Sequence, residues 1–307
     1  MGTTYTLKLA DVPNGVSLDE LFARVESVLE TVNDQMSTWR DDSEISRFNT
    51  YSGTDWFDVS EETAYVAKKS LEFSELSGGA FDITVGPLVD VWGFGKQGQD
   101  FRIPSDEDIA AAKEYVGANR IEVRDDPPAL RKTDGRTQIN LSAIAKGHGV
   151  DRVAEVLEQA GVTSYMVEIG GEIRTGKKKG NGEAWTIGIE PPNSGPRGQV
   201  FKKVSFVNRS LATSGDYRNV FTKDGKRYSH TIDPRSGRPV EHSLASVSVI
   251  ADTCAEADAL ATALMVLGTE EGYNLAAEHH WPVLFIRRTA AGFEERSTPE
   301  FETFVAN

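Results

Sequence analysis

An acidic and a hydroxyl side chain stand four residues apart in an apolar segment near the carboxyl end of the chain. The segment is residues 253–268, TCAEADALATALMVLG, and the two side chains belong to Asp258 and Thr262. Because four residues are about one turn of an α-helix, both oxygen groups lie on one strip of a predicted helix. A buried carboxylate needs a compensating partner, and Mg²⁺ prefers such oxygen ligands. The spacing therefore indicates a magnesium site, unless Thr262 bonds back to the preceding turn and Asp258 to a backbone amide.

Two further positions carry groups that suit reactions of phosphates. Lys146 comes just before Gly147 at a predicted junction of a strand and a helix, where free backbone amides and the helix dipole favour an anion. We therefore predict a phosphate contact at Lys146. His230 precedes residues 233–239, a turn rich in proline and glycine. Since imidazole has an ordinary pKa of about 6.5, it suits proton transfer near neutral pH, and the sequence leaves open whether His230 is an acid–base group or a structural residue.

Glycine-rich clusters recur along the chain, and glycine allows the backbone to approach a ligand closely. Each cluster by itself is more typical of a turn than of a binding site. None fits the G-x-G-x-x-G pattern of dinucleotide-binding folds or the P-loop pattern, so the sequence excludes those two routes to nucleotide binding. The clusters are residues 78–82 (GGAFD), 141–147 (LSAIAKG), 169–172 (IGGE) and 212–217 (ATSGDY).

The bulk composition indicates a globular protein in which any phosphate site is local. The 307 residues are 39% hydrophobic, and no apolar run is long enough to span a bilayer. The formal net charge of −14 argues against nucleic acid as a partner. Cys254 is the only cysteine, which excludes an internal disulfide, and its place at the start of an apolar helix is typical of a small core residue.

The hydrophobic patterns predict an α+β fold with a mixed, largely antiparallel sheet packed with helices. Predicted strands outnumber helices in the second half of the chain, and short turns separate several of them. We expect helices at residues 18–36, 61–77, 105–116, 150–160 and 253–268, and strands at residues 4–9, 120–123, 138–141, 165–169, 185–189, 205–207, 211–212, 246–250 and 283–287.

Ordered blocks over nearly the whole chain resemble the ApbE family, the FAD:protein FMN transferases or flavin-trafficking proteins. The blocks are residues 1–3, 36–39, 43–49, 79–82, 141–147, 170–172, 212–217, 230–237 and 257–262. One position departs from the family pattern, because Asn140 stands where the family often has Asp before Leu-Ser-Ala; it keeps an acceptor oxygen but loses the charge. The resemblance implies a single ApbE-like domain over residues 1–307, which can divide into two subdomains with the FAD and Mg²⁺ site between them.

The resemblance also implies roles for individual residues. It assigns the Ala143 carbonyl, Asp258 and Thr262 to Mg²⁺, and His230 to proton transfer from the acceptor hydroxyl. The metal pair is the same pair that the helical spacing indicates. The Trp39 and Phe81 rings are expected to hold the flavin. The residues implied for FAD binding are Met1, Trp39, Ala80, Phe81, Asp82, Asn140, Lys146 and Ile232.

The activity implied by the resemblance is the Mg²⁺-dependent transfer of FMN from FAD to a Thr or Ser hydroxyl of a target protein, with release of AMP. The implied acceptor is a flavoprotein subunit with a Ser/Thr-Gly-Ala-Thr-like site. Two alternatives would use the same site: an Mg²⁺-dependent FAD pyrophosphatase giving FMN and AMP, and a non-catalytic FAD carrier. The implied location is the cell envelope or periplasm, as a lipoprotein whose leader precedes a motif like residues 1–3.

Overall fold

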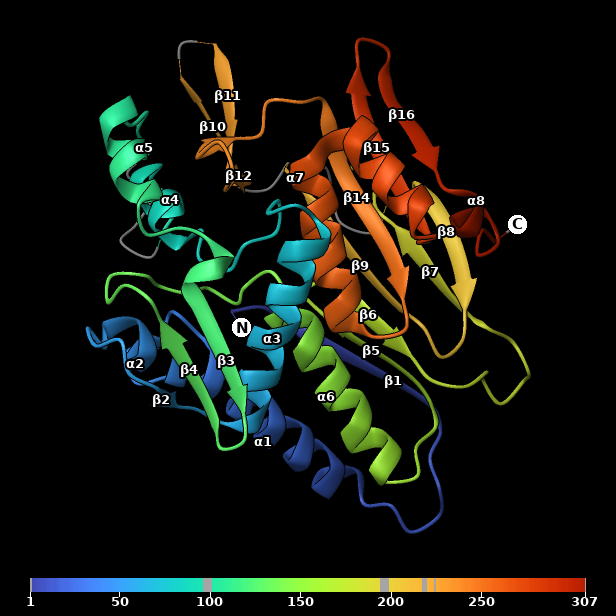
Figure 1. Ribbon diagram of the computed structural model, residues 1–307. Coiled ribbons are helices and arrows are strands. Elements are labelled where there is room, and N and C mark those ends of the chain that lie inside the picture. Colours follow the sequence, from blue (N-terminus) through green and yellow to red (C-terminus); the bar gives the residue numbers. More distant parts are fainter. Residues whose placement is uncertain (1, 96–100, 194–198, 217–219, 224, 307) are drawn as a thin grey trace. The chain divides into compact units, whose positions relative to one another are not determined.

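The computed structural model describes residues 2–95, 101–193, 199–216, 220–223 and 225–306, which form two compact units (Figure 1). Unit 1 comprises Met1–Thr31, Ile144–Arg218 and Ser243–Asn307, and unit 2 comprises Val32–Ala143 and Asn219–His242. Each unit combines helices with antiparallel strands, which confirms the predicted α+β fold. The predicted location of the FAD and Mg²⁺ site between two subdomains stays a prediction.

Unit 1 is built on a seven-stranded sheet in the order β1-β5-β6-β9-β14-β15-β16, and every neighbouring pair is antiparallel. A separate two-stranded sheet pairs β7 with β8. The interior strand β14 is buried along almost its whole length, as expected of a strand covered on both faces. The strands are β1 (Tyr5–Asp11), β5 (Ser164–Ile169), β6 (Glu172–Thr175), β7 (Trp185–Ile189), β8 (Lys202–Phe206), β9 (Ser210–Gly215), β14 (Leu244–Ala251), β15 (Val283–Thr289) and β16 (Gly292–Ser297).

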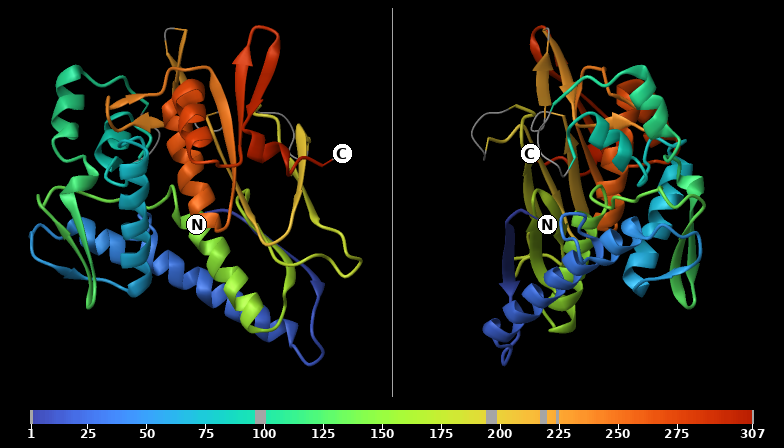
Figure 2. Two further views of the ribbon diagram at one scale, coloured as in Figure 1. Left: turned by 45° about the vertical axis from the view of Figure 1, so that its right-hand side comes forward. Right: turned by 90° about the vertical axis from the view of Figure 1, so that its left-hand side faces the viewer.

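Helices α6 (Ala145–Gln159) and α7 (Cys254–Glu278) pack against each other and against the large sheet (Figures 1 and 2). Val153 and Leu157 of α6 share a core with Tyr165 and Val167 of β5. The intervening residue Met166 belongs to a second core, with β7, β8 and helix α8 (Pro299–Glu302), because successive side chains of a strand point to opposite faces. The sheet therefore separates the layer of α6 and α7 from the layer of β7, β8 and α8.

Helix α7 contains a break at the residue where the sequence predicts its end. Gly268 has φ 79° and ψ −177°, which glycine adopts without the clash that a Cβ would cause. Helix α1 (Leu18–Met36) begins and ends at the residues predicted from its apolar spacing. In the described parts of the chain, no helix is long and apolar enough to cross a membrane.

Unit 2 is organised around a three-stranded sheet in the order β2-β4-β3, against which α3 packs. A second core joins Leu88, Trp92 and Ile109 to Ile232, and the Trp92 indole donates a hydrogen bond to the Gly237 carbonyl at 3.0 Å. That bond ties the turn after His230 to the core. The elements are α2 (Glu44–Thr50), β2 (Phe57–Asp58), α3 (Glu61–Leu76), α4 (Gly86–Val91), α5 (Asp106–Lys113), the 3₁₀ helix η1 (Ala118–Arg120), β3 (Ile121–Asp125), β4 (Pro128–Lys132), β10 (Val220–Lys223), β11 (Lys226–Ser229), β12 (Ile232–Asp233) and β13 (Arg238–Pro239).

The strand predicted at residues 138–141 is wrong, because this segment forms no strand. The Ile139 N–H donates to Asn49 Oδ1 at 2.8 Å, and Asn49 Nδ2 donates to the Ile139 carbonyl at 2.8 Å. A side-chain amide thus satisfies both backbone groups that a neighbouring strand would otherwise pair. The buried Lys132 ammonium donates to the Thr137 carbonyl at 3.1 Å and fixes the start of the same segment.

Candidate functional site

Three charged side chains from three elements of unit 1 meet in one cluster. Lys146 lies in the first turn of α6, Glu172 is the first residue of β6, and Asp258 lies in the second turn of α7. Lys146 Nζ is 3.0 Å from Glu172 Oε1, and it lies 3.3 and 3.4 Å from the two carboxylate oxygens of Asp258. Both carboxylates are buried, whereas the Lys146 side chain is 33% exposed. The Lys146 side chain is therefore the most accessible of the three, which are called the charged cluster below.

Thr262 stands one helical turn after Asp258 and extends the row of oxygen groups along α7. Its hydroxyl lies 3.2 Å from the Ser214 hydroxyl of β9, within hydrogen-bond distance. The Asp258 carboxylate accepts the Gly147 N–H at 3.0 Å, so the alternative contact with a backbone amide is present for this residue. Since Asp258 also pairs with Lys146, the amide contact does not account for the whole environment of the carboxylate.

Glycines allow the three elements to bring these side chains together. A Cβ on Gly147 would lie 2.2 Å from the Cys254 carbonyl oxygen, so only glycine lets the start of α6 approach the start of α7 this closely. Gly170 and Gly171 have φ of 65° and 108°, and they form the turn that places Ile169 opposite Glu172. The glycine-rich sequence clusters thus act here through packing and turn geometry.

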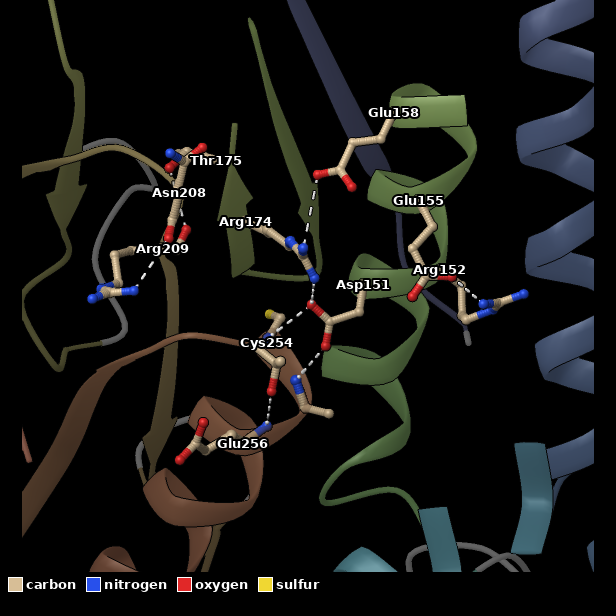
Figure 3. Close-up of polar contacts among 12 residues, drawn as sticks. Asp151, Arg152, Glu155, Glu158, Arg174, Thr175, Asn208, Arg209, Cys254 and Glu256 are labelled. Carbon is tan, nitrogen blue, oxygen red and sulfur yellow. Dashed lines mark hydrogen bonds and ion pairs between the residues drawn. The ribbon is translucent and has the colours of Figure 1, made fainter. Parts of the chain in front are cut away.

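A second polar network braces the same three elements (Figure 3). The Asp151 carboxylate of α6 accepts the backbone N–H groups of Cys254 and Ala255, both at 2.9 Å, and so caps the start of α7. Arg174 of β6 donates to Asp151 at 2.7 Å. Arg174 and Glu172 stand two residues apart on β6 and therefore share a face of the strand. This Asp151–Arg174 brace links the elements that carry the charged cluster.

The charged groups of the cluster shift one another's pKa values. Burial disfavours the ammonium of Lys146, but Asp258 and Glu172 outweigh burial and raise the Lys146 pKa above its usual value. Burial, with a smaller contribution from Asp258, raises the pKa of Glu172 to a net value of about 7, although the nearby Lys146 ammonium lowers it. Within the described residues, Glu172 Oε2 is buried without a hydrogen-bond partner. With both carboxylates ionised, the cluster carries one negative charge in excess.

The donors in this part of unit 1 fit Mg²⁺. The Asp258 carboxylate and the Thr262 hydroxyl are oxygen ligands, and the excess negative charge favours a cation. Over the described ranges no group of three or more His, Cys, Asp or Glu could hold a metal ion. A site with only a few protein ligands suits Mg²⁺, because this ion takes its remaining ligands from water and substrate phosphates. Ala143 belongs to unit 2, and its part in metal binding stays a prediction.

In unit 2, three residues assigned to FAD lie in the segment that follows α3, at positions 80–82. Gly78 and Gly79, with φ of 59° and 80°, end the helix and redirect the chain. The Phe81 ring is 1% exposed and packs edge to face against Phe73, with centroids 6.2 Å apart. The Phe81 ring thus fills the core, and its contact with the flavin stays a prediction. The neighbouring Ala80 is also buried, so a role of this segment in FAD binding would use its backbone.

Two polar residues assigned to FAD stabilise turns of unit 2. Asp82 Oδ1 accepts the Thr84 N–H at 2.7 Å and the Thr84 hydroxyl at 2.6 Å. Burial raises the pKa of Asp82, and the bonds from Thr84 offset part of the rise. Asn140 Oδ1 accepts the Ser142 N–H at 2.9 Å, which is the contact of an Asx-turn. The residue that departs from the family pattern thus orders the loop before Ala143.

The other assigned residues of unit 2 differ in exposure. The Trp39 indole is 67% exposed and can stack on a flat ring. Ile232 is 5% exposed and packs in the core. His230 is half-buried, with its ring edge-on to Phe94 at a centroid distance of 6.4 Å. Asp233 accepts the Arg235 N–H at 2.9 Å and caps the turn that follows His230. Met1, also assigned to FAD, lies outside the described residues.

The sequence did not identify four residues that the structure places around the charged cluster. Glu172 was part of a glycine-rich block, and an acid directly after a two-glycine turn was its one local signal. Asp151 and Arg174 resemble ordinary surface charges in the sequence, and Ser214 stands in a block noted for its glycine. Their roles come from contacts between distant segments, which no local spacing reveals.

Comparisons with known proteins identify the family of the chain. A sequence profile described as the ApbE family matches residues 1–285. The chain is 42% identical to the FAD:protein FMN transferase of Vibrio cholerae over 306 residues, covering 100% of this chain and 91% of the relative. It is 39% identical to the FAD:protein FMN transferase of Haemophilus influenzae, covering 98% of this chain and 88% of the relative.

Solved structures with the same fold also carry this family name. The flavin transferase ApbE from Vibrio cholerae matches with a TM-score of 0.90 and 42% identity, covering 99% of this chain and 96% of that protein. The apo form of the Pseudomonas stutzeri flavinyl transferase ApbE matches with a TM-score of 0.90 and 40% identity, covering 99% and 94%.

Proposed function

The chain belongs to the ApbE family, and on that premise we propose that it transfers FMN from FAD to an acceptor protein. The charged cluster is the observation that carries the proposal. A lysine with a partly exposed side chain beside a buried carboxylate and a hydroxyl suits a diphosphate that is bound together with Mg²⁺. The finer parts of the proposal are the dependence on Mg²⁺, a Thr or Ser hydroxyl in a Ser/Thr-Gly-Ala-Thr-like site as acceptor, and AMP as the second product.

The reaction exchanges one phosphoester bond for another. The acceptor hydroxyl oxygen forms a bond to the FMN-side phosphorus of FAD, and the bond from that phosphorus to the bridging oxygen breaks. The bridging oxygen leaves as part of AMP, and the hydroxyl proton passes to His230. General-base help of this kind contributes about a hundredfold to ten-thousandfold. The flavin then remains on the acceptor through a phosphoester.

Lys146 and Asp258 of the charged cluster, together with Thr262, would bind and orient the diphosphate. Bound Mg²⁺ would neutralise the negative charge of the phosphate oxygens. Asp258 and Thr262 would hold the metal, and Lys146 would place a point charge beside the leaving phosphate. The exposed Trp39 indole offers a stacking surface for the flavin. These roles require positioning and charge, which are the main contributions of proteins to phosphoryl transfer.

One incubation separates this proposal from its two alternatives. The protein is mixed with FAD, Mg²⁺ and an acceptor carrying the hydroxyl site, and a second acceptor has alanine at that position. The proposal expects flavin fluorescence on the first acceptor in a denaturing gel, with one AMP per flavin by chromatography. Free FMN with AMP and an unlabelled acceptor would indicate a pyrophosphatase instead. Unchanged FAD would indicate a carrier.

We also propose that the protein acts in the cell envelope, as its resemblance to the family suggests. Immunoblots of cytoplasmic, periplasmic and membrane fractions from the native source test this location. Recovery in the cytoplasmic fraction alone would contradict it.

A further inference from the structure

Glu172 is a buried acid that the proposed mechanism does not use. Its side chain is 6% exposed, and one of its oxygens lies 3.0 Å from Lys146 Nζ. The other oxygen, Oε2, is buried and has no hydrogen-bond partner among the described residues. Because a buried carboxylate with unused hydrogen-bonding capacity destabilises the fold, its presence calls for a reason in binding or catalysis.

The position of Lys146 creates a conflict for metal binding. Its ammonium lies 3.3 and 3.4 Å from the two carboxylate oxygens of Asp258, where it neutralises the charge that would bind a cation. A metal ion on Asp258 would repel this ammonium, and the repulsion is strong because the surroundings are poorly solvated. The ammonium therefore needs another carboxylate when the metal binds.

We propose that Glu172 is a positioning residue that holds the Lys146 ammonium while Asp258 binds Mg²⁺. This inference rests on the proposed function. The ammonium already lies closer to Glu172, at 3.0 Å, than to Asp258, at 3.3 Å, and Oε2 of Glu172 is free to accept a second bond. The Glu172 carboxylate then pairs with the lysine, and the Asp258 carboxylate binds the metal.

The backbone around Glu172 keeps this carboxylate in place during the exchange. The Gly170–Gly171 turn sets the start of β6, and the Asp151–Arg174 brace ties β6 to both helices (Figure 3). With Mg²⁺ bound, two carboxylates, one ammonium and one divalent ion leave one positive charge in excess. Such a site attracts a diphosphate, whereas without Glu172 the excess would be two charges and the lysine and the metal would repel each other.

Titration with Mn²⁺ alone, followed by electron paramagnetic resonance, tests the inference without FAD or acceptor, because Mn²⁺ also prefers oxygen ligands. Glu172→Gln is expected to weaken Mn²⁺ binding by about tenfold or more, and Glu172→Asp to recover part of the loss. Glu270→Gln removes the same charge from an exposed position of α7 and should change the affinity less than about twofold. Circular dichroism melts of the metal-free proteins establish that each variant is folded.

Lys146→Met provides the decisive comparison, because it removes the group through which Glu172 is proposed to act. In that background Glu172→Gln should change Mn²⁺ affinity by less than about twofold, since the ammonium through which Glu172 acts is absent. Equal losses in both backgrounds would overturn the inference and make Glu172 act on the metal directly. Wild-type affinity in the Glu172→Gln protein would overturn it as well.

Asp258→Ala marks the metal site in the same titration and should abolish the Mn²⁺ binding. If the Asp258→Ala protein bound Mn²⁺ as the wild type does, the inference about Glu172 would fall with the metal site. The flavin-transfer assay decides the proposed function separately, because it detects labelled acceptor whatever the outcome of the titration.

Discussion

Replacing Asp258 by alanine and by asparagine separates the chemical role of its charge from its structural role. Both variants lose the carboxylate that pairs with Lys146 at 3.3 Å and is proposed to hold Mg²⁺. Loss of a metal-based stabilisation of the transferring phosphate lowers the rate by about a hundredfold to a thousandfold or more. We therefore expect both variants to lose most flavin transfer and to show no response to added Mg²⁺.

The two variants should differ in stability, because Asp258 also accepts the Gly147 N–H at 3.0 Å. Alanine leaves this buried amide without a partner, which costs about 1–3 kcal/mol. Asparagine keeps an oxygen that can accept the same bond, so its cost should stay below about 1 kcal/mol. In both proteins Lys146 retains its contact with Glu172 at 3.0 Å, and the fold should persist.

The measurements are urea denaturation and the rate of acceptor labelling as a function of Mg²⁺ concentration. Asp252→Asn is the matched control, because its side chain is 73% exposed and should affect neither measurement. A wild-type Mg²⁺ titration in the Asp258→Asn protein would refute the assignment of the metal ligand. Equal destabilisation of the two variants would refute the role given to the Gly147 amide.

Three further changes test other parts of the site. His230→Ala should keep FAD binding but lower acceptor labelling by about a hundredfold to ten-thousandfold. The control His279→Ala removes an exposed ring stacked on Trp281, with centroids 4.6 Å apart, and should label normally. Loss of FAD binding in His230→Ala would instead make His230 a binding residue. EDTA should weaken FAD affinity in calorimetry without abolishing it, because stacking on the exposed Trp39 indole does not need the metal. An unchanged affinity would show that the metal does not contact the diphosphate of FAD. Gly147→Ala should lower the free energy of unfolding in urea by about 1–3 kcal/mol, because its Cβ would lie 2.2 Å from the Cys254 carbonyl oxygen. Gly180→Ala is the control, because its Cβ would lie 4.0 Å from the nearest atom. Equal urea midpoints for the two variants would contradict the close approach of α6 and α7.

Patterns within about one helical turn were enough to predict several parts of the protein. The apolar spacing predicted both ends of α1, and Gly268 marked the break in α7. The same local geometry placed Asp258 and Thr262 on one strip of their helix, and the burial of Asp258 follows from the apolar residues around it. These features depend on neighbours in the chain, whose spacing is fixed by the geometry of the helix.

Other features depended on which distant segments meet, and only the tertiary structure decided them. Residues 138–141 have the pattern of a strand, but the side chain of Asn49 supplies their hydrogen bonds. Glu172 and Asp258 belong to segments far apart in the chain, and a close approach of helices that only Gly147 permits helps to bring their elements together. The sequence by itself determined where carboxylates could lie on a helix or after a turn. Which of them share one ammonium was decided by packing, because the Coulomb interaction depends on distance in space and not on separation along the chain.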